Sequence, residues 1–223
     1  MNLKLFIQKV SRRLFGAKKI FNRDIHTALT YSLGTGNRID ECVIASTVLI
    51  RDNCYIYNTK IDEHTYISSD ASIMNTTIGK FCSIAQGVKI CTGSHPSSIF
   101  VTTHPAFFSL HKQSGITFVE ENHFREMGKC IIGNDVWIGN NVVILDDIII
   151  GDGAIIGAGA IITKDIPPYA VVLGIPGKIK RFRFNSDEID FLLKFKWWDK
   201  DDEWLKKNHL LFLNIKSFVK YFK

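Results

Sequence analysis

Residues 132–162 read IGNDVWIGNNVVILDDIIIGDGAIIGAGAII, and an isoleucine returns in this stretch at every sixth position. The isoleucines are Ile132, Ile138, Ile144, Ile150, Ile156 and Ile162. A period of six fits neither the 3.6-residue period of a helix nor the two-residue alternation of a strand. It fits a coil of short strands in which each hexapeptide forms one side of a triangular prism and its isoleucine points inward. This stretch therefore decides the fold.

A second run with the same period lies upstream, and weaker turns begin at Ile50. The second run consists of Ile61, Ile67, Ile73, Ile78, Ile84 and Ile90, with one five-residue step. The fifth repeat position is mostly small, and Gly, Asn and Asp at positions two to four permit turns that bulkier residues resist. Each coil buries its apolar side only by stacking on its neighbours. We therefore expect an all-β solenoid, since repeated six-residue steps argue against a β-sandwich with coincidental spacing.

The repeat is interrupted once and is followed by a different pattern. The period stops at His95 and resumes near Cys130, which predicts a loop at 95–130 inserted in a β-helix of residues 36–183. A long insertion in a compact repeat is usually functional. Residues 184–223 are predicted to form two or three short helices, and Asn185 with Glu188 three residues later is typical of a helix start.

The net charge of +6 is concentrated at the N-terminus. Residues 1–23 hold seven Lys or Arg and no acid, so the rest of the chain is nearly neutral and shows no nucleic-acid footprint. Residues 1–35 are predicted to form a basic segment that is helical, with an apolar stripe at Leu3, Ile7, Val10 and Leu14. This segment either packs on the end of the solenoid or contacts an anionic membrane surface through residues 1–23.

The five cysteines follow no metal-ligand spacing, and most lie inside the apolar repeats, where a free thiol acts as a small hydrophobe. We therefore expect no metal site and a reducing compartment. No apolar run approaches the roughly 18 residues of a membrane-spanning helix, and the start lacks the features of a signal peptide. A cytoplasmic location is the expectation, with the inner membrane face as a further possibility for the basic segment.

Residues 91–109, CTGSHPSSIFVTTHPAFFS, are the most specific stretch for chemistry. His95 stands where the loop leaves the prism, between a rigid coil and a loop. An imidazole has an unperturbed pKa of about 6.5 and can accept a hydroxyl proton near neutral pH. Attack of a hydroxyl on a thioester needs such a base. From these residues alone, His95 is either a catalytic base or a loop histidine that stabilises a turn.

These motifs resemble those of a known family. The repeats resemble the left-handed β-helix (hexapeptide-repeat) acyltransferases, and SHP at 94–96 with TTHPAFF at 102–108 resembles the active-site stretch of their xenobiotic and polysaccharide O-acetyltransferase subgroup. KFKWWDKDDEWLKKN, residues 194–208, is similar to the helical tail of that subgroup. The resemblance implies a left-handed coil, a homotrimer with sites between subunits, and His95 as the base. It implies that His104 lines the acceptor pocket or anchors the loop.

The resemblance also implies an acetyl-CoA site in the coils that follow the loop. Their glycine corners expose backbone groups that a pantetheine arm can use, and fixed positive charge is required near the nucleotide phosphates. Ordered from the thioester to the phosphates, the implied residues are Trp137, Gly139, Asn140, Ala158, Thr163, Lys164, Lys178 and Arg181.

The activity that the resemblance implies is direct acetyl transfer from acetyl-CoA within a ternary complex. The expected acceptor is a sugar hydroxyl of a capsular or lipopolysaccharide precursor, which the TTHP phrase and the basic start favour. The alternatives are acetylation of a streptogramin-type antibiotic, N-acetylation of an amino sugar, and a non-catalytic β-helix scaffold. The acetyl-CoA segment argues against the scaffold.

Overall fold

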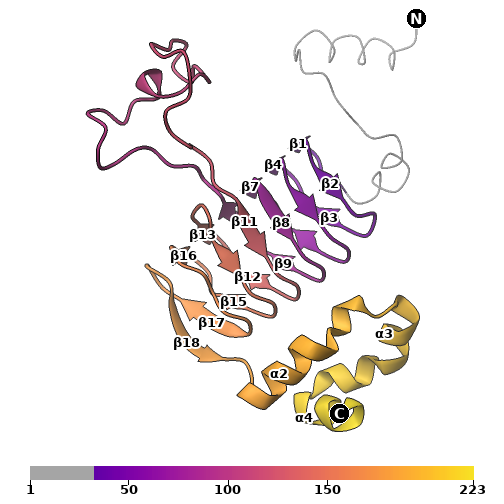
Figure 1. The fold of residues 1–223 in the computed structure, drawn as a ribbon. Coiled ribbons are helices and arrows are strands. Elements are labelled where there is room, and N and C mark those ends of the chain that lie inside the picture. Colours follow the sequence, from indigo (N-terminus) through magenta and orange to yellow (C-terminus); the bar gives the residue numbers. More distant parts are fainter. Residues whose placement is uncertain (1–32) are drawn as a thin grey trace, which may run out of the picture.

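A computed structural model describes residues 33–223, which form a three-sided parallel β-helix followed by a group of helices (Figure 1). Consecutive strands belong to different sheets, so each turn of the chain adds one strand to every side. The six-stranded sheet contains β1 (Arg38–Asp40), β4 (Tyr55–Tyr57), β7 (Ser72–Met74), β10 (Lys89–Ile90), β13 (Val143–Ile144) and β16 (Ile161–Ile162). The five-stranded sheet contains β2 (Val43–Ile44), β5 (Lys60–Ile61), β8 (Thr76–Ile78), β11 (Cys130–Ile132) and β14 (Ile149–Ile150).

The third sheet has seven strands and closes the last coil. It contains β3 (Leu49–Ile50), β6 (Tyr66–Ile67), β9 (Ser83–Ile84), β12 (Trp137–Ile138), β15 (Ile155–Ile156), β17 (Ala170–Leu173) and β18 (Lys178–Phe182). All strand pairs are parallel except β17 with β18, which form an antiparallel hairpin. The prediction of an all-β solenoid with a helical C-terminal region is confirmed.

The core is the stack of isoleucines that the period predicts. Every isoleucine of the two runs is at most 1% exposed, and stacking is in register, as between Ile90 and Ile144. The second inward row is small, because it lies beside the corners: Val136, Ala154 and Cys82 are at most 1% exposed. All five cysteines are free, and burial raises the pKa of the Cys82 thiol to about 12, so this thiol is a packing residue.

The backbone conformation at one corner of the prism accounts for the Asn, Asp and Gly residues of the repeats. Asn53, Asp70, Gly87, Asn141 and Gly159 all have a positive φ between 55° and 71°. Their backbone N–H groups donate to the coil before, for example from Asn141 to the Gln86 carbonyl at 2.9 Å. Left-handed backbone strongly favours these three residue types, so the turn sets the sequence at each level.

The chain leaves the solenoid after β10 at Cys91 and returns at β11. Between these points it projects away from the prism as a long arm that contains the short 3-10 helix η3 (Pro105–Phe107) (Figure 1). The arm has a small core of its own, in which Phe108 is fully buried and lies 5.6 Å from Phe124, between ring centroids.

The C-terminal tail contains α2 (Ser186–Phe195), η4 (Trp197–Asp199), α3 (Asp202–Asn208), η5 (His209–Leu213) and α4 (Ile215–Phe222). Asn185 and Glu188 form the capping box at the start of α2 that the sequence predicts. Side chains of Phe195, Trp204, Phe218 and Phe222 pack together, with Phe195 and Phe222 ring centroids 5.0 Å apart. No helix among residues 33–223 is long and apolar enough to cross a membrane. The helix predicted near the N-terminus lies outside the described residues.

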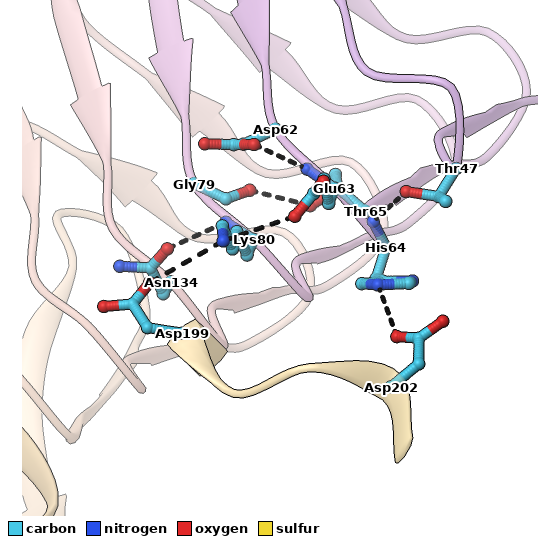
Figure 2. A network of polar contacts seen from close by, with 10 residues as sticks. All are labelled: Thr47, Asp62, Glu63, His64, Thr65, Gly79, Lys80, Asn134, Asp199 and Asp202. Atoms are coloured by element: carbon cyan, nitrogen blue, oxygen red, sulfur yellow. Dashed lines mark hydrogen bonds and ion pairs between the residues drawn. The ribbon is translucent and has the colours of Figure 1, made fainter. Parts of the chain in front are cut away.

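Polar contacts attach the tail to the side of the solenoid (Figure 2). Lys80 pairs with Asp199 at 3.7 Å and with Glu63 at 3.3 Å, and His64 lies 3.2 Å from Asp202. Beside them, the Phe81 ring lies 4.9 Å from the Trp197 ring. Residues of successive coils therefore fix the tail to one wall of the prism.

A second attachment joins the tail to the last coils. Arg183 pairs with Asp135 at 2.9 Å and donates to the Gly153 carbonyl at 2.7 Å. The guanidinium lies 5.3 Å from the centre of the Tyr169 ring. Burial raises the pKa of Asp135, and the charge and hydrogen bond of the nearby Arg183 oppose that rise.

Candidate active site

The predicted base, His95, lies at the root of the projecting arm and is exposed. Its Nδ1 is 2.7 Å from the backbone carbonyl of Thr103. A carbonyl can only accept, so Nδ1 carries the hydrogen and donates it, which leaves Nε2 as the unprotonated, basic nitrogen. The imidazole and the Phe108 ring form an edge-to-face pair, with their ring centroids 5.9 Å apart. The arm thus holds one tautomer and one orientation.

At the root of the arm, one carboxylate links the outgoing and the returning segments of the chain. Asp146 Oδ1 accepts from the Gly128 N–H at 2.9 Å and from the Cys91 thiol at 3.0 Å. Gly128 is required there, since a Cβ on it would lie 2.8 Å from the Asp146 Cβ. We call Cys91, Gly128 and Asp146 the neck of the arm. His95 follows Cys91 by four residues, so the neck positions the backbone that carries the imidazole.

Two further contacts reinforce the neck. Ser94 N–H donates to the Glu126 carbonyl at 2.8 Å, directly before His95. Asp147 accepts from the Lys129 N–H at 3.1 Å and pairs with Arg125. The Lys129 hydrogen bond is the main reason that the pKa of Asp147 is lowered. The outgoing and returning chains are therefore held against the same turn, 145–148.

His104 has a different environment. Its Nδ1 accepts from the Ala106 N–H at 3.2 Å and caps η3, and its own N–H donates to Thr102 Oγ1 at 3.1 Å. Because the capping contact occupies Nδ1 as an acceptor, His104 anchors the loop in this structure. Contact with the acceptor substrate stays a prediction for this residue.

The residues predicted to bind acetyl-CoA fall into separate groups on the solenoid. Gly139 stacks directly on Ala158, and a Cβ on Gly139 would lie 2.6 Å from the Ala158 nitrogen. The Gly159 N–H donates to the Asn140 carbonyl at 2.8 Å. Asn140 and Ala158 are exposed. These three predicted residues therefore share one corner, where the six-stranded sheet begins.

Thr163 lies at the opposite end of that sheet. The Leu145 N–H donates to the Ile162 carbonyl at 3.0 Å and the Cys91 N–H to the Ile144 carbonyl at 3.1 Å. Thr163 and Lys164 thus follow the strand end that lies two coils below the root of the arm. The structure separates this pair from the corner of Asn140 and Ala158.

The remaining predicted residues lie on the seven-stranded sheet and its hairpin. Trp137 is 54% exposed and lies in the outward row of that sheet, next to Ile155. Arg181, on β18, belongs to the same row, because Ile155 pairs with Val171 and Val171 pairs with Arg181. Lys178 starts β18, directly after Gly177, whose N–H donates to the Ile161 carbonyl at 2.8 Å. The hairpin therefore lies against the coil that carries Ala158.

Three of the predicted residues are exposed cations. Lys164, Lys178 and Arg181 are exposed, and none forms an ion pair with any residue of 33–223. Lys178 and Arg181 lie on the hairpin beside the corner of Asn140 and Ala158, and unpaired cations in that place suit a phosphate-bearing ligand with a slender arm. In the same part of the chain, no three His, Cys, Asp or Glu side chains gather as a metal-ligand group.

Comparison with known proteins indicates the family to which the chain belongs. Residues 129–164 match the family described as bacterial transferase hexapeptide (six repeats). The chain is 42% identical over 124 residues to a probable macrolide acetyltransferase of Lysinibacillus sphaericus, which covers 55% of this chain and 68% of that protein. It is 38% identical over 143 residues to a chloramphenicol acetyltransferase of Agrobacterium fabrum, which covers 63% of this chain and 68% of that protein.

A solved structure shares the fold at low identity. A mutant of AntD, an N-acyltransferase from Bacillus cereus in complex with dTDP and coenzyme A, aligns with a TM-score of 0.58 and 16% identity, over 79% of this chain and 96% of that chain. The fold, the repeats and the relatives together define the class: the chain belongs to the hexapeptide-repeat acetyltransferase family. The prediction of an acetyltransferase enzyme is confirmed, and the polysaccharide subgroup stays a prediction.

Sequence reasoning did not find the neck of the arm. The signal was present, because residues 144–149 read ILDDII, whereas the other four hexapeptides between 132 and 161 carry glycine at the second position. At the coil that supports the arm, Leu145 replaces the usual glycine and is followed by two adjacent acids, Asp146 and Asp147. Sequence reasoning also missed Thr103, whose backbone carbonyl accepts from the His95 imidazole.

Proposed function

We propose that this protein transfers the acetyl group of acetyl-CoA to a hydroxyl of its acceptor, with His95 as the general base. The observation that carries the proposal is the hydrogen bond from His95 Nδ1 to the Thr103 carbonyl, at 2.7 Å. It fixes the tautomer whose Nε2 can take a proton, on an exposed imidazole in a member of an acetyltransferase family.

The reaction needs one base and no covalent enzyme intermediate. The acceptor hydroxyl oxygen attacks the acetyl carbonyl carbon while Nε2 of His95 removes the hydroxyl proton. The carbon–sulfur bond then breaks, and the proton passes from the imidazolium to the departing thiolate. The Thr103 carbonyl stabilises the imidazolium that exists between these steps, because it accepts from the opposite ring nitrogen.

Acetyl-CoA is the donor, and the residues on the solenoid are suited to it. The exposed corner of Asn140 and Ala158 offers backbone groups to the pantetheine arm, and the buried Gly139 lets the two coils stack closely at this corner. Lys178 and Arg181 supply positive charge for the phosphates from the adjacent hairpin.

A homotrimer with sites between subunits is part of the proposal. The arm projects away from its own solenoid (Figure 1), so His95 needs a surface from a second copy to complete a closed cleft. The five-stranded sheet presents an outward row in which Val43, Ile131 and Ile149 are 65%, 49% and 48% exposed. Packing of such rows would bury this apolar surface around a threefold axis.

The acceptor we propose is a saccharide hydroxyl of a capsular or lipopolysaccharide precursor. Support comes from the TTHP phrase at 102–105 and the basic segment at 1–23. Chloramphenicol or a macrolide is a second candidate, because the relatives with 37–42% identity carry these names. Both candidates place a hydroxyl at Nε2 of His95, and they differ only in what the arm must recognise.

The test is an acceptor panel with purified full-length protein and acetyl-CoA, in which release of coenzyme A is followed with a thiol reagent. The panel contains nucleotide sugars, oligosaccharides, amino sugars, chloramphenicol, a macrolide and a streptogramin. Turnover with saccharide hydroxyls and none with the antibiotics supports the first candidate, and the reverse supports the second. Turnover with amino sugars alone would contradict O-acetylation.

A further inference from the structure

The charges of the C-terminal tail are divided between its two halves. Residues 184–205 hold seven acids and three lysines, whereas residues 206–223 hold five lysines and no acid. The five are Lys206, Lys207, Lys216, Lys220 and Lys223. An even distribution would serve solubility equally well, so this division indicates two different surroundings for the two halves.

The acidic half is used to attach the tail to the solenoid. Figure 2 shows Asp199 directed at Lys80 and Asp202 directed at His64, both from coils of the β-helix. Asp201 caps α3 by accepting from the Trp204 N–H at 2.7 Å. By contrast, no lysine of 206–223 forms an ion pair with any described residue.

The basic half also exposes large apolar side chains. Leu210 is 69% exposed and Leu213 is 80% exposed, and both lie in η5. In a 3-10 helix, residues three apart lie above one another, so the two leucines share one side. Phe212, on another side of η5, packs on the aromatic cluster at 5.2 Å from Trp197. The leucines are thus turned away from the core of the tail.

Helix α4 continues the same pattern. Its inner face carries Phe218 and Phe222, which contact Phe195. Lys216, Lys220 and Lys223 recur at spacings of four and three and therefore share a face that points outward. We call these three lysines, together with Lys206, Lys207, Leu210 and Leu213, the basic tail surface.

We propose that the basic tail surface binds a membrane that contains anionic lipids. Lysines attract anionic headgroups, and the two exposed leucines can enter the interfacial layer. Two other occupants are disfavoured by charge: residues 1–23 carry seven cations and no acid, and a second copy would present the same five lysines. Two leucines also bury far less than the roughly 1,200 Å² of a stable protein interface.

This binding would hold the enzyme at the membrane surface, in reach of acceptors carried on a lipid. The inference does not rest on the proposed function, because vesicle binding is measured without turnover. It also differs from contact through residues 1–23, which lie outside the described part of the chain. The two contributions can be separated by deletion.

The experiment is co-sedimentation of full-length protein with vesicles of phosphatidylcholine alone or with 30% phosphatidylglycerol. One variant changes the five lysines of the basic tail surface to Gln, and a second carries Leu210→Ser and Leu213→Ser. The matched control changes Lys194, Lys196 and Lys200 of the acidic half to Gln. Each variant is first checked for an unchanged melting temperature, and light scattering is recorded without vesicles.

We expect binding to the anionic vesicles only, weakened at least ten-fold by the five-lysine variant and several-fold by the leucine variant, with little change in the control. Deletion of residues 1–23 should leave the effect of both variants in place. Equal binding of the wild type and the five-lysine variant overturns the proposal. So does a leucine variant whose light-scattering mass falls, because the surface would then be an interface between copies.

Discussion

Removal of the Asp146 carboxylate should impair catalysis without removing any group that touches the substrates. In Asp146→Ala, the Gly128 N–H and the Cys91 thiol lose the acceptor that they share, at 2.9 Å and 3.0 Å. A hydrogen bond to a charged group contributes about 1.5–3 kcal/mol, and a thiol is a weak donor. Because Asp146 is half-buried, we expect the loss of both hydrogen bonds to destabilise the closed neck by about 2–3 kcal/mol.

That loss translates into turnover through the position of His95. About 1.4 kcal/mol corresponds to a factor of ten, so the equilibrium constant for closing the neck falls about 30–140-fold. The Ser94–Glu126 hydrogen bond and the Asp147 contacts remain and recover part of this. We expect kcat to fall about 10–50-fold, with a smaller change in KM for acetyl-CoA, since the loss concerns placement of the base.

The assay compares steady-state kinetics of Asp146→Ala, Asp146→Asn and Asp52→Ala. Asn keeps an acceptor oxygen and should restore most of the turnover. Asp52 is the matched control, because its Oδ1 accepts from the Thr35 N–H at 2.6 Å and from Thr35 Oγ1 at 3.1 Å on a coil without an arm. Asp52→Ala should reduce stability and leave kcat nearly unchanged. Equal loss of kcat in Asp146→Ala and Asp52→Ala would refute the role of the neck.

Three further predictions concern cofactor binding, stability and assembly. Lys164→Ala or Arg181→Ala should raise KM for acetyl-CoA about ten-fold with a smaller change in kcat, and an unchanged KM in both would remove these residues from the site. Arg183→Met should lower the free energy of unfolding by about 3 kcal/mol, because it leaves Asp135 unpaired in a partly buried position. Burial raises the pKa of Asp135, and loss of Arg183 raises it further, so the loss of unfolding free energy in Arg183→Met should become smaller as the pH falls. Urea unfolding at two pH values measures this loss, and a loss that grows at the lower pH would contradict the prediction. We expect the proposed trimer to have a light-scattering mass of three times 25.3 kDa and Ile131→Glu to reduce it to that of one chain, whereas a persistent trimer would locate the interface elsewhere.

The sequence was informative wherever a local rule repeats. The six-residue period predicted the inward stack of isoleucines, because every coil meets the same neighbours and the pattern is reinforced at each level. The capping box at Asn185 and Glu188 was predicted for a similar reason, since both partners lie within one turn of helix. The break in the period located the arm, although the chain leaves the solenoid at Cys91, four residues before His95.

The rest depends on contacts between residues that are distant in the chain. Asp146 accepts hydrogen bonds from Cys91, 55 residues away in the sequence, and from Gly128, 18 residues away. No local sequence pattern indicates which donors a carboxylate will contact at such separations. The same holds for Lys80 and Asp199, which attach the tail to the wall of the prism. The predicted acetyl-CoA residues came from a resemblance, and the solenoid distributes them over two corners and a hairpin of one chain. Their convergence therefore requires more than one copy or a long ligand.

The central claim is that the imidazole of His95 removes the acceptor proton. The direct measurement is kcat of His95→Ala beside His104→Ala, with coenzyme A binding and the melting temperature recorded for both. General base catalysis contributes about 10²–10⁴-fold, so His95→Ala should lose turnover by that factor while it stays folded and still binds coenzyme A. His104→Ala should be clearly milder, because this residue caps η3 through Nδ1. Near-normal turnover in His95→Ala, with turnover abolished in His104→Ala, would contradict the claim and assign the base to the second histidine.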